Sequence, residues 1–331
     1  MKLSRKKNPV LERENQMEIS RDKVVIIGAG QVGATVAFSL VVQEVCAEIV
    51  LIDMNETKAI GEANDIKHGI EYFGRNVKVE AGTYADCKDA DIVVLTASAP
   101  YSGEQNRIQM MDKSASIVRS IVPQVMASGF DGIFVVVTNP VDIISYMVYQ
   151  LSGLPKNQII GTGTAIETSR LKQLIGQTLS IDPRNVEALA LGEHGDSLFV
   201  PWSIARAGGK NLREIIKDNP EYSSIDLAQL EDQTRKAGFD VLNKKGNTQY
   251  GIATIATGII RAVLRDEYRA APVSTLLEGE YGITDAFIGV PAILNRYGVV
   301  DVVELHLEEE EQKKLEASVA VIKDNIKKLG L

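Results

Sequence analysis

A short apolar run, a glycine-rich turn and a helical pattern follow one another near the start of the chain. KVVIIG (23–28) is typical of a buried strand, and GATVAFSLVVQ (33–43) is typical of a helix. Between them Gly28, Gly30 and Gly33 form the pattern G-x-G-x-x-G. These glycines allow a tight turn, close approach of a pyrophosphate, and close packing of helix on strand. The helix N-terminus then offers unpaired N–H groups to an anion. The segment therefore predicts a dinucleotide-binding turn.

An acidic residue follows this turn where such folds require one. The run AEIVLID (47–53) is typical of a second buried strand and ends at Asp53. An acid about 20 residues beyond the glycines accepts hydrogen bonds from the adenosine ribose hydroxyls. Its charge repels the extra phosphate of NADP, and no arginine follows closely to accommodate that phosphate. The sequence therefore predicts NAD over NADP. The alternative is that Asp53 only caps the following helix.

Strand-like and helical patterns alternate through the first half of the chain. The continuously apolar strand runs predict a parallel sheet covered on both faces. The further runs are a helical pattern at 56–73 and strand patterns at 90–97, 131–140 and 158–163. Beyond about Gly161 a helix starts near Thr164, and long helical patterns cover roughly 223–245 and 248–267. We expect an α/β protein, with a doubly wound parallel Rossmann sheet followed by an α+β substrate domain. The expected division is an arm (1–22), an NAD-binding domain (23–161) and a substrate and catalytic domain (162–331).

Composition narrows the possible partners. The 331 residues are 45% hydrophobic and 24% charged, as in ordinary globular proteins, and no apolar run approaches the length of a membrane span. The net charge of −8 argues against nucleic acid, whose phosphates need basic patches. The first 22 residues are too charged for a signal peptide. Cys46 and Cys87 are too few for a disulfide framework and predict reduced thiols in the cytoplasm. No residue cluster has metal-ligand spacing, so no metal is expected.

Chemistry-bearing residues gather in a few polar segments. His194, one of only three histidines, lies in the glycine-flanked acidic turn LGEHGDS (191–197). Glu167 and Arg170 are three residues apart on one face of a predicted helix. Asn139 follows a strand, where ligands bind in such sheets. Arg107 is the one cation of a polar loop after the third strand.

From Lys23 to Leu331 the chain resembles the lactate/malate dehydrogenase family. The matching motifs are GAGQVG, LTAS, TNPVD, GTGT with a following TSR, LGEHGDS, KKGNTQYGIA and GVPAILNRYGVVD. The resemblance implies hydride transfer between a nicotinamide and a small 2-oxo acid. The implied cofactor contacts are Gly28, Gly30, Gln31, Val32, Gly33, Asp53, Thr96, Ala97 and Asn139.

The resemblance also implies a role for each candidate catalytic residue. His194 matches the histidine that donates and accepts the proton, and Glu167 takes the position of the carboxylate that orients its ring. Arg170 matches the arginine that binds the substrate carboxylate. Arg107 matches the arginine of a mobile loop that polarises the carbonyl. The implied substrate contacts are Arg170, Asn139, Thr248 and Tyr101.

Two positions depart from the family pattern. The family almost always has Asp where this chain has Glu167, so the His194 partner is one methylene longer. The alternative for Glu167 is a simple ion pair with Arg170. Tyr101 falls on the specificity position, where lactate enzymes have a Gln-like residue and malate enzymes have Arg. Without a second free cation, a second substrate carboxylate would be buried unpaired, which argues against malate.

Three functions remain at this point. The expected function is reversible reduction of pyruvate to L-lactate, as in glycolysis and fermentation. The first alternative is an L-2-hydroxyacid dehydrogenase for bulkier acids such as 2-oxoisocaproate or phenylpyruvate. The second is a non-enzymatic NAD-binding subunit.

Assembly and regulation are expectations from the same resemblance. We expect a cytoplasmic homo-oligomer, a tetramer or a dimer, with the 56–73 helix as a candidate contact. Related enzymes that fructose bisphosphate activates bind it through an Arg and a His, at positions that here carry Lys172 and Glu187. An anion beside a phosphate is unfavourable, so we expect activation to be weak or absent. The acidic run Glu308–Glu311 is expected to open a C-terminal helix, where its charges suit the helix dipole.

Overall fold

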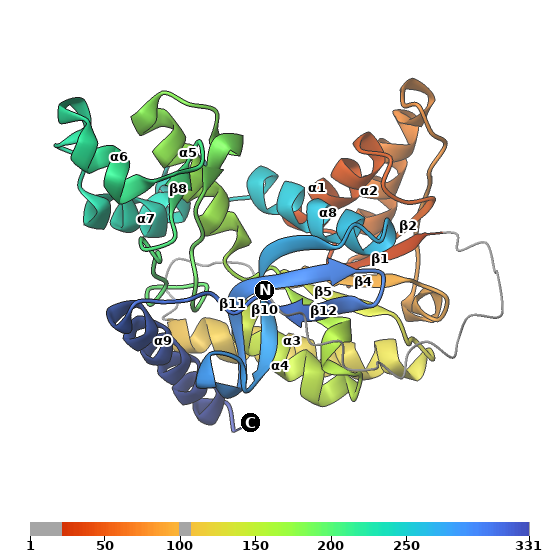
Figure 1. Ribbon diagram of the computed structural model, residues 1–331. Helices are drawn as coiled ribbons and strands as arrows, with labels where there is room; N and C mark the ends of the chain where they lie inside the picture. Colours follow the sequence, from red (N-terminus) through yellow and green to blue (C-terminus); the bar gives the residue numbers. More distant parts are fainter. Residues whose placement is uncertain (1–21, 99–106, 331) are drawn as a thin grey trace.

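The structure is a computed structural model that describes residues 22–98 and 107–330, with the backbone alone at 107–110. Its centre is a nine-stranded sheet in the order β12-β11-β10-β6-β5-β4-β1-β2-β3, and a small sheet has the order β7-β8-β9 (Figure 1). The strands of the large sheet are β1 (Lys23–Ile27), β2 (Glu48–Ile52), β3 (Lys78–Ala81), β4 (Ile92–Leu95), β5 (Ile133–Val136), β6 (Ile159–Gly161), β10 (Arg269–Glu278), β11 (Thr284–Asn295) and β12 (Gly298–Val302). The small sheet comprises β7 (Val186–Glu187), β8 (Arg206–Ala207) and β9 (Lys210–Asn211).

Nine α-helices lie in the described residues. They are α1 (Gln31–Val42), α2 (Glu56–His68), α3 (Arg107–Ala127), α4 (Val141–Ser152), α5 (Ala165–Leu179), α6 (Leu212–Asp218), α7 (Leu227–Lys245), α8 (Tyr250–Leu264) and α9 (Glu309–Lys328).

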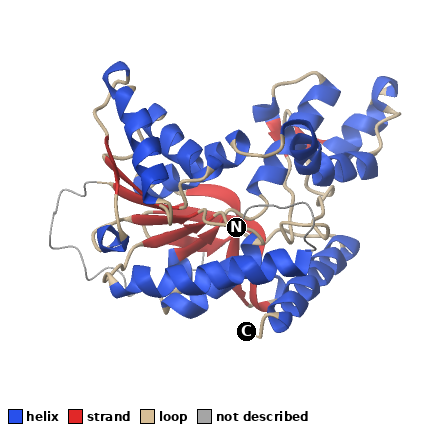
Figure 2. Ribbon diagram, turned by 180° about the vertical axis from the view of Figure 1, so that it is seen from behind, coloured by secondary structure: helices blue, strands red, loops and turns tan. Residues whose placement is uncertain are grey.

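Strands β1 to β6 form the parallel, doubly wound part of the sheet, as predicted. Every residue of β1, β4 and β5 is buried, because helices cover both faces of the sheet. Apolar residues of α1, α2 and α8 pack on one face and those of α3 and α4 on the other, and Figure 2 shows the sheet between these two layers. The carboxyl ends of these strands therefore meet along one edge, where the glycine turn lies.

The sheet continues beyond the predicted domain boundary at residue 161. Strand β10 pairs antiparallel with β6 through Ser274 and Gly161, and a long hairpin joins β10 to β11. The sequence analysis predicted neither these three C-terminal strands nor β3. Helices α5, α6 and α7 and the small sheet form a separate lobe with its own core around Leu171, Val200 and Trp202.

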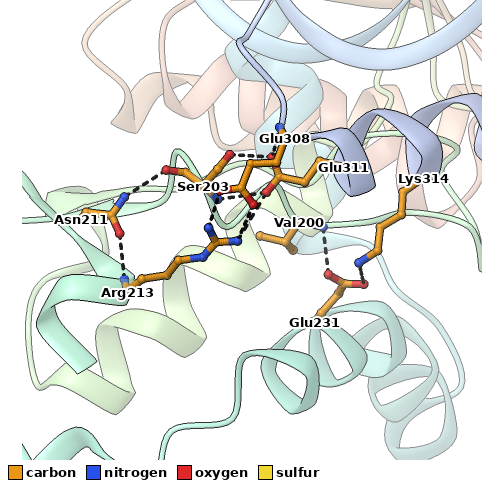
Figure 3. Close-up of polar contacts among 8 residues, drawn as sticks. All are labelled: Val200, Ser203, Asn211, Arg213, Glu231, Glu308, Glu311 and Lys314. Atoms are coloured by element: carbon orange, nitrogen blue, oxygen red, sulfur yellow. Dashed lines mark hydrogen bonds and ion pairs between the residues drawn. The ribbon is translucent and has the colours of Figure 1, made fainter. Parts of the chain in front are cut away.

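Helix α9 starts where the acidic run predicted a helix, and Glu308 is its N-cap. The run also makes contacts that the sequence analysis did not predict. Glu311 is buried and accepts hydrogen bonds from the Ser203 backbone N–H and hydroxyl. Glu308 forms two hydrogen bonds with Arg213, at 2.6 and 3.0 Å (Figure 3). The acidic residues therefore tie α9 to the lobe of α5–α7.

Candidate active site

The glycine turn between β1 and α1 has the geometry of a cradle for a phosphate group. Gly28 has a φ of +107°, which favours glycine, and its N–H donates to the Ile52 carbonyl at 2.7 Å. A Cβ on Gly33 would lie 1.9 Å from the Gly28 oxygen, so only glycine lets α1 pack here. A Cβ on Gly30 would meet nothing within 4 Å, which leaves this side of the turn open. The turn therefore fits a bound pyrophosphate, with Gly28 in the tight turn and Gly33 at the close contact between helix and strand.

Asp53 lies beside this turn at the end of β2. Its Oδ2 accepts from the Ala29 N–H at 2.8 Å, and its Oδ1 accepts from the Asn55 N–H at 2.9 Å. The N-cap of α2 is Asn55, which accepts from the Lys58 N–H, so Asp53 is not needed for that cap. A partly exposed carboxylate next to the open glycine turn fits the ribose of NAD.

The other predicted cofactor residues line the same edge of the sheet. The Thr96 hydroxyl donates to the Gly28 carbonyl at 2.8 Å, and Ala97 packs against the glycine turn. Gln31 and Val32 begin α1, with Gln31 exposed. Asn139 is exposed after β5 and precedes a cis bond to Pro140. The carboxyl ends of β1, β2, β4 and β5 thus bring these residues together.

A single carboxylate connects the predicted catalytic histidine and the predicted substrate arginine. Glu167 Oε2 lies 2.9 Å from His194 Nδ1, and Glu167 Oε1 accepts from Arg170 Nη1 at 2.8 Å. Glu167 is 3% exposed, because α5 starts beneath the turn that carries His194. Glu167 therefore makes both of the interactions that the sequence left as alternatives, one with His194 and one with Arg170. The longer side chain of Glu167 therefore still reaches the histidine.

The charges around His194 favour its protonated form. Burial opposes the charged ring, but the Glu167 carboxylate and its hydrogen bond outweigh burial, and the pKa of His194 rises to about 9. Asp142 supports this rise and Arg170 opposes it. Burial likewise opposes ionisation of Glu167, but His194 and Arg170 hold the pKa of Glu167 below its ordinary value. The pair is therefore an imidazolium and a carboxylate at neutral pH.

Asp142 is a site residue that the sequence analysis missed. It lies in the first turn of α4, is 2% exposed, and its Oδ2 accepts from the His194 backbone N–H at 2.8 Å. Burial raises the pKa of Asp142 to about 6, against the opposing effects of Ser274 and His194. The signal was an acid in the first turn of a helix at the ligand-binding edge, three residues after Asn139.

Gly238 is a second missed residue. It lies on α7, where a Cβ would come within 3.1 Å of Arg170 Nη2 and 3.2 Å of Nη1. The guanidinium therefore lies against a part of α7 that a larger residue would crowd. Nothing in the sequence pairs these positions.

The structure describes no side-chain contact for three further predicted residues. Thr248 is partly exposed in the connection between α7 and α8. Arg107 is the first residue of α3, but its side chain is outside the described part of the structure. Tyr101 lies wholly outside the described residues.

No helix in 22–98 or 107–330 is both long enough and apolar enough to cross a membrane. The same ranges contain no group of three His, Cys, Asp or Glu side chains placed to hold a metal ion.

Comparison with known proteins gives matches over nearly the whole chain. The family model for the lactate/malate dehydrogenase NAD binding domain matches residues 22–161, and that for the alpha/beta C-terminal domain matches residues 164–330. L-lactate dehydrogenase 1 of Bifidobacterium longum is 47% identical over 308 residues, 93% of this chain and 98% of that protein. L-lactate dehydrogenase 3 of Bacillus cereus is 45% identical over 309 residues, with the same coverage. The ligands-bound minor L-lactate dehydrogenase of Enterococcus mundtii superposes with a TM-score of 0.91 at 41% identity, covering 94% of this chain and 99% of that one.

Proposed function

The chain belongs to the lactate/malate dehydrogenase family, and from this premise we propose that it is an NAD-dependent L-lactate dehydrogenase. It reduces pyruvate reversibly to L-lactate, with His194 as the proton donor and acceptor. NADH, when bound at the glycine turn, supplies the hydride. The observation that carries the proposal is the single Glu167 carboxylate that holds both His194 and Arg170.

The proton step follows from how His194 is held. Because Nδ1 is bonded to Glu167, the proton available to a substrate is on Nε2. The imidazolium donates it to the pyruvate carbonyl oxygen as charge develops there, and the Glu167 carboxylate stabilises the charged ring. In lactate oxidation the neutral ring accepts the proton, so the same pair serves both directions.

The charges of the site match a monocarboxylate. His194 and Arg170 carry one positive charge each, and Glu167 carries one negative charge, so the trio has a net charge of +1. One substrate carboxylate, bound by the Arg170 guanidinium, balances that charge. With Arg107 engaged at the carbonyl oxygen, a second carboxylate would have no further proposed cation to pair with, which supports pyruvate over oxaloacetate.

A substrate panel tests the proposal. We expect kcat/KM for NADH-dependent reduction to be highest with pyruvate, lower with 2-oxoisocaproate and lowest with oxaloacetate. A higher value with 2-oxoisocaproate would identify the bulkier-substrate enzyme instead. If the protein binds NADH but reduces none of these acids, it is a non-enzymatic NAD-binding subunit.

The remaining site residues have proposed roles within this reaction. Arg107, the first residue of α3, polarises the pyruvate carbonyl, and Tyr101 limits the size of the substrate side chain. Asn139 orients the substrate oxygen at the end of β5, and Thr248 borders the pocket between α7 and α8. The support is the family match over both parts of the chain and, for Asn139, its exposed place at the ligand-binding edge.

We also propose that the protein works as a homo-oligomer, a tetramer or a dimer. Large apolar side chains on the outer surface of α1 and α2 support this: Phe38 is 50% exposed, Val42 46% and Ile60 50%. The edge-on contact of Phe38 with Phe73 extends the apolar surface toward the end of α2. Light scattering coupled to size-exclusion chromatography measures the mass, and a monomer at micromolar concentration would contradict the proposal.

The proposed location is the cytoplasm, where a fermentative enzyme of glycolysis would act. Both cysteines are buried free thiols, and burial raises the pKa of Cys46 and of Cys87 to about 12. Buried protonated thiols suit a reducing compartment. Fractionation of the source cells tests this location directly.

A further inference from the structure

The turn that carries His194 closes through a ring of three hydrogen bonds that includes Ser318 of α9. The Glu193 backbone N–H donates to Ser318 Oγ at 2.7 Å, and the Ser197 hydroxyl donates to Glu193 Oε2 at 2.5 Å. The two serine oxygens lie 2.9 Å apart. Since the Ser197 proton points to the carboxylate, the Ser318 hydroxyl donates to Ser197 Oγ. Each group in the ring therefore has its partner.

Ser318 is buried against this turn. It is 0% exposed, and it is 125 positions beyond Glu193 in the chain. A Cβ on Gly192, whose φ is +99°, would lie 2.7 Å from Ser318 Oγ. The bridge between Leu191 and Phe199 closes the base of the same turn. The contact therefore depends on the Ser318 hydroxyl and on the absence of a side chain at Gly192.

Helix α9 is anchored by core packing and by polar contacts, and these hold Ser318 in place. Leu315, Val319 and Ile322 are buried in the core cluster that contains Leu191 and Phe199. At the helix N-terminus the contacts of Glu308 and Glu311 attach α9 to the lobe of α5–α7 (Figure 3). Lys314 Nζ also lies 3.7 Å from Glu231 Oε1, and the other oxygen of Glu231 accepts from the Val200 N–H.

We propose that Ser318 is a positioning residue for proton transfer, which holds the Glu193 peptide so that the His194 ring stays aligned with Glu167. The inference rests on the proposed function. Two adjacent peptides of the turn are held by side chains from different helices: Asp142 of α4 accepts from the His194 N–H, and Ser318 accepts from the Glu193 N–H. Without Ser318 the first peptide can rotate, and the ring loses its fixed position.

The substitution Ser318→Ala removes one acceptor and one donor from the ring. We expect kcat for pyruvate reduction to fall about tenfold, since a misplacement of a catalytic group by about 1 Å can cost roughly a hundredfold and the shift expected here is smaller. NADH affinity should stay unchanged, since the glycine turn lies on other elements. Ser318→Thr keeps the hydroxyl and should retain most of the activity. Thr257→Val is a control that removes another fully buried hydroxyl, on α8, which makes no hydrogen bond with the described residues, and it should leave kcat unchanged.

A histidine titration separates positioning from simple loss of stability. With three histidines, His194 can be followed by NMR. The charged groups that act on His194 are Glu167, Asp142 and Arg170. Poorer alignment with Glu167 should lower the His194 pKa in Ser318→Ala but not in Thr257→Val. This readout needs no substrate, so it tests the inference even if the protein does not reduce pyruvate.

Each possible result for the Ser318 variants either supports or overturns the inference. A reduced kcat and a lowered His194 pKa in Ser318→Ala, with both restored in Ser318→Thr, support the inference. An unchanged His194 pKa in a folded Ser318→Ala protein overturns it, whatever the activity. Equal losses in Ser318→Ala and Ser318→Thr, matched by equal falls in melting temperature, would show that packing alone is at work and would also overturn it.

Discussion

The Glu167 carboxylate should set the pH range of the enzyme, and Glu167→Gln removes its charge while keeping its shape. The protein raises the pKa of His194 from 6.5 to about 9. At 1.36 kcal/mol per pH unit, this shift favours the imidazolium by about 3 kcal/mol. Burial and Arg170 both act against the charged ring and only Asp142 still favours it, so loss of the Glu167 carboxylate should return the His194 pKa toward 6.5.

The sign of the effect depends on the direction of reaction. Pyruvate reduction needs the imidazolium, so wild-type activity should persist up to about pH 9 and fall above it. At pH 8 the protonated fraction falls from about nine-tenths to about three-hundredths in Glu167→Gln, a loss of roughly thirtyfold from protonation alone. Lactate oxidation needs the neutral ring, so its lower pH limit should move to a more acidic value in the same variant.

The assay is kcat/KM for NADH-dependent pyruvate reduction between pH 5 and 10. Much of the activity lost by Glu167→Gln at pH 8 should return near pH 5.5, which a misfolded protein would not show. Glu167→Asp keeps the charge and should keep a raised midpoint. Glu214→Gln, an exposed change on α6, should keep the wild-type profile. A wild-type pH profile in Glu167→Gln would refute the assignment of the raised pKa to this carboxylate.

Three further predictions concern cofactor, regulation and stability. Asp53→Ser should raise kcat/KM for NADPH relative to NADH, because the charge that repels the 2′-phosphate is gone; an unchanged ratio would place the ribose elsewhere. Fructose bisphosphate should change pyruvate kcat/KM by less than about twofold, because Glu187 lies beside Lys172, whose pKa burial lowers; strong activation in a titration would contradict this. Glu311→Ala should lower the free energy of unfolding in urea by about 1–3 kcal/mol, because it leaves the partly buried N–H and hydroxyl of Ser203 without their acceptor.

The parts of the site that the sequence predicted are those set by local geometry. The glycine turn follows from spacing along one strand and one helix. Glu167 and Arg170 share a helical face, so their pairing was visible in the sequence. The match of His194 with Glu167 depended on family resemblance, because the two residues belong to separate elements.

The parts that were missed arise from long-range packing. Strand β10 joins the sheet by pairing with β6, and β11 and β12 then extend the sheet beyond β10. No local sequence pattern predicts this pairing. Asp142 and Ser318 both support the histidine turn from helices distant in sequence, as does Gly238 for Arg170. For Glu311 the sequence predicted only a charge at the start of a helix, but in the folded protein its carboxylate is buried against Ser203. Such contacts exist only once the elements are assembled.

The pairing of β6 with β10 has a consequence for how the molecule can be divided. A fragment that ends at Gly161 would lack β10, so the edge of β6 would be unpaired. It would also lack α8, whose apolar side chains pack with those of α1 in one core cluster. Neither half is a self-sufficient module, and the whole chain should melt in one cooperative step. Chimeras of related enzymes, joined between the two family matches, must preserve the pairing of β6 with β10 and the packing of α8 on α1 in order to fold.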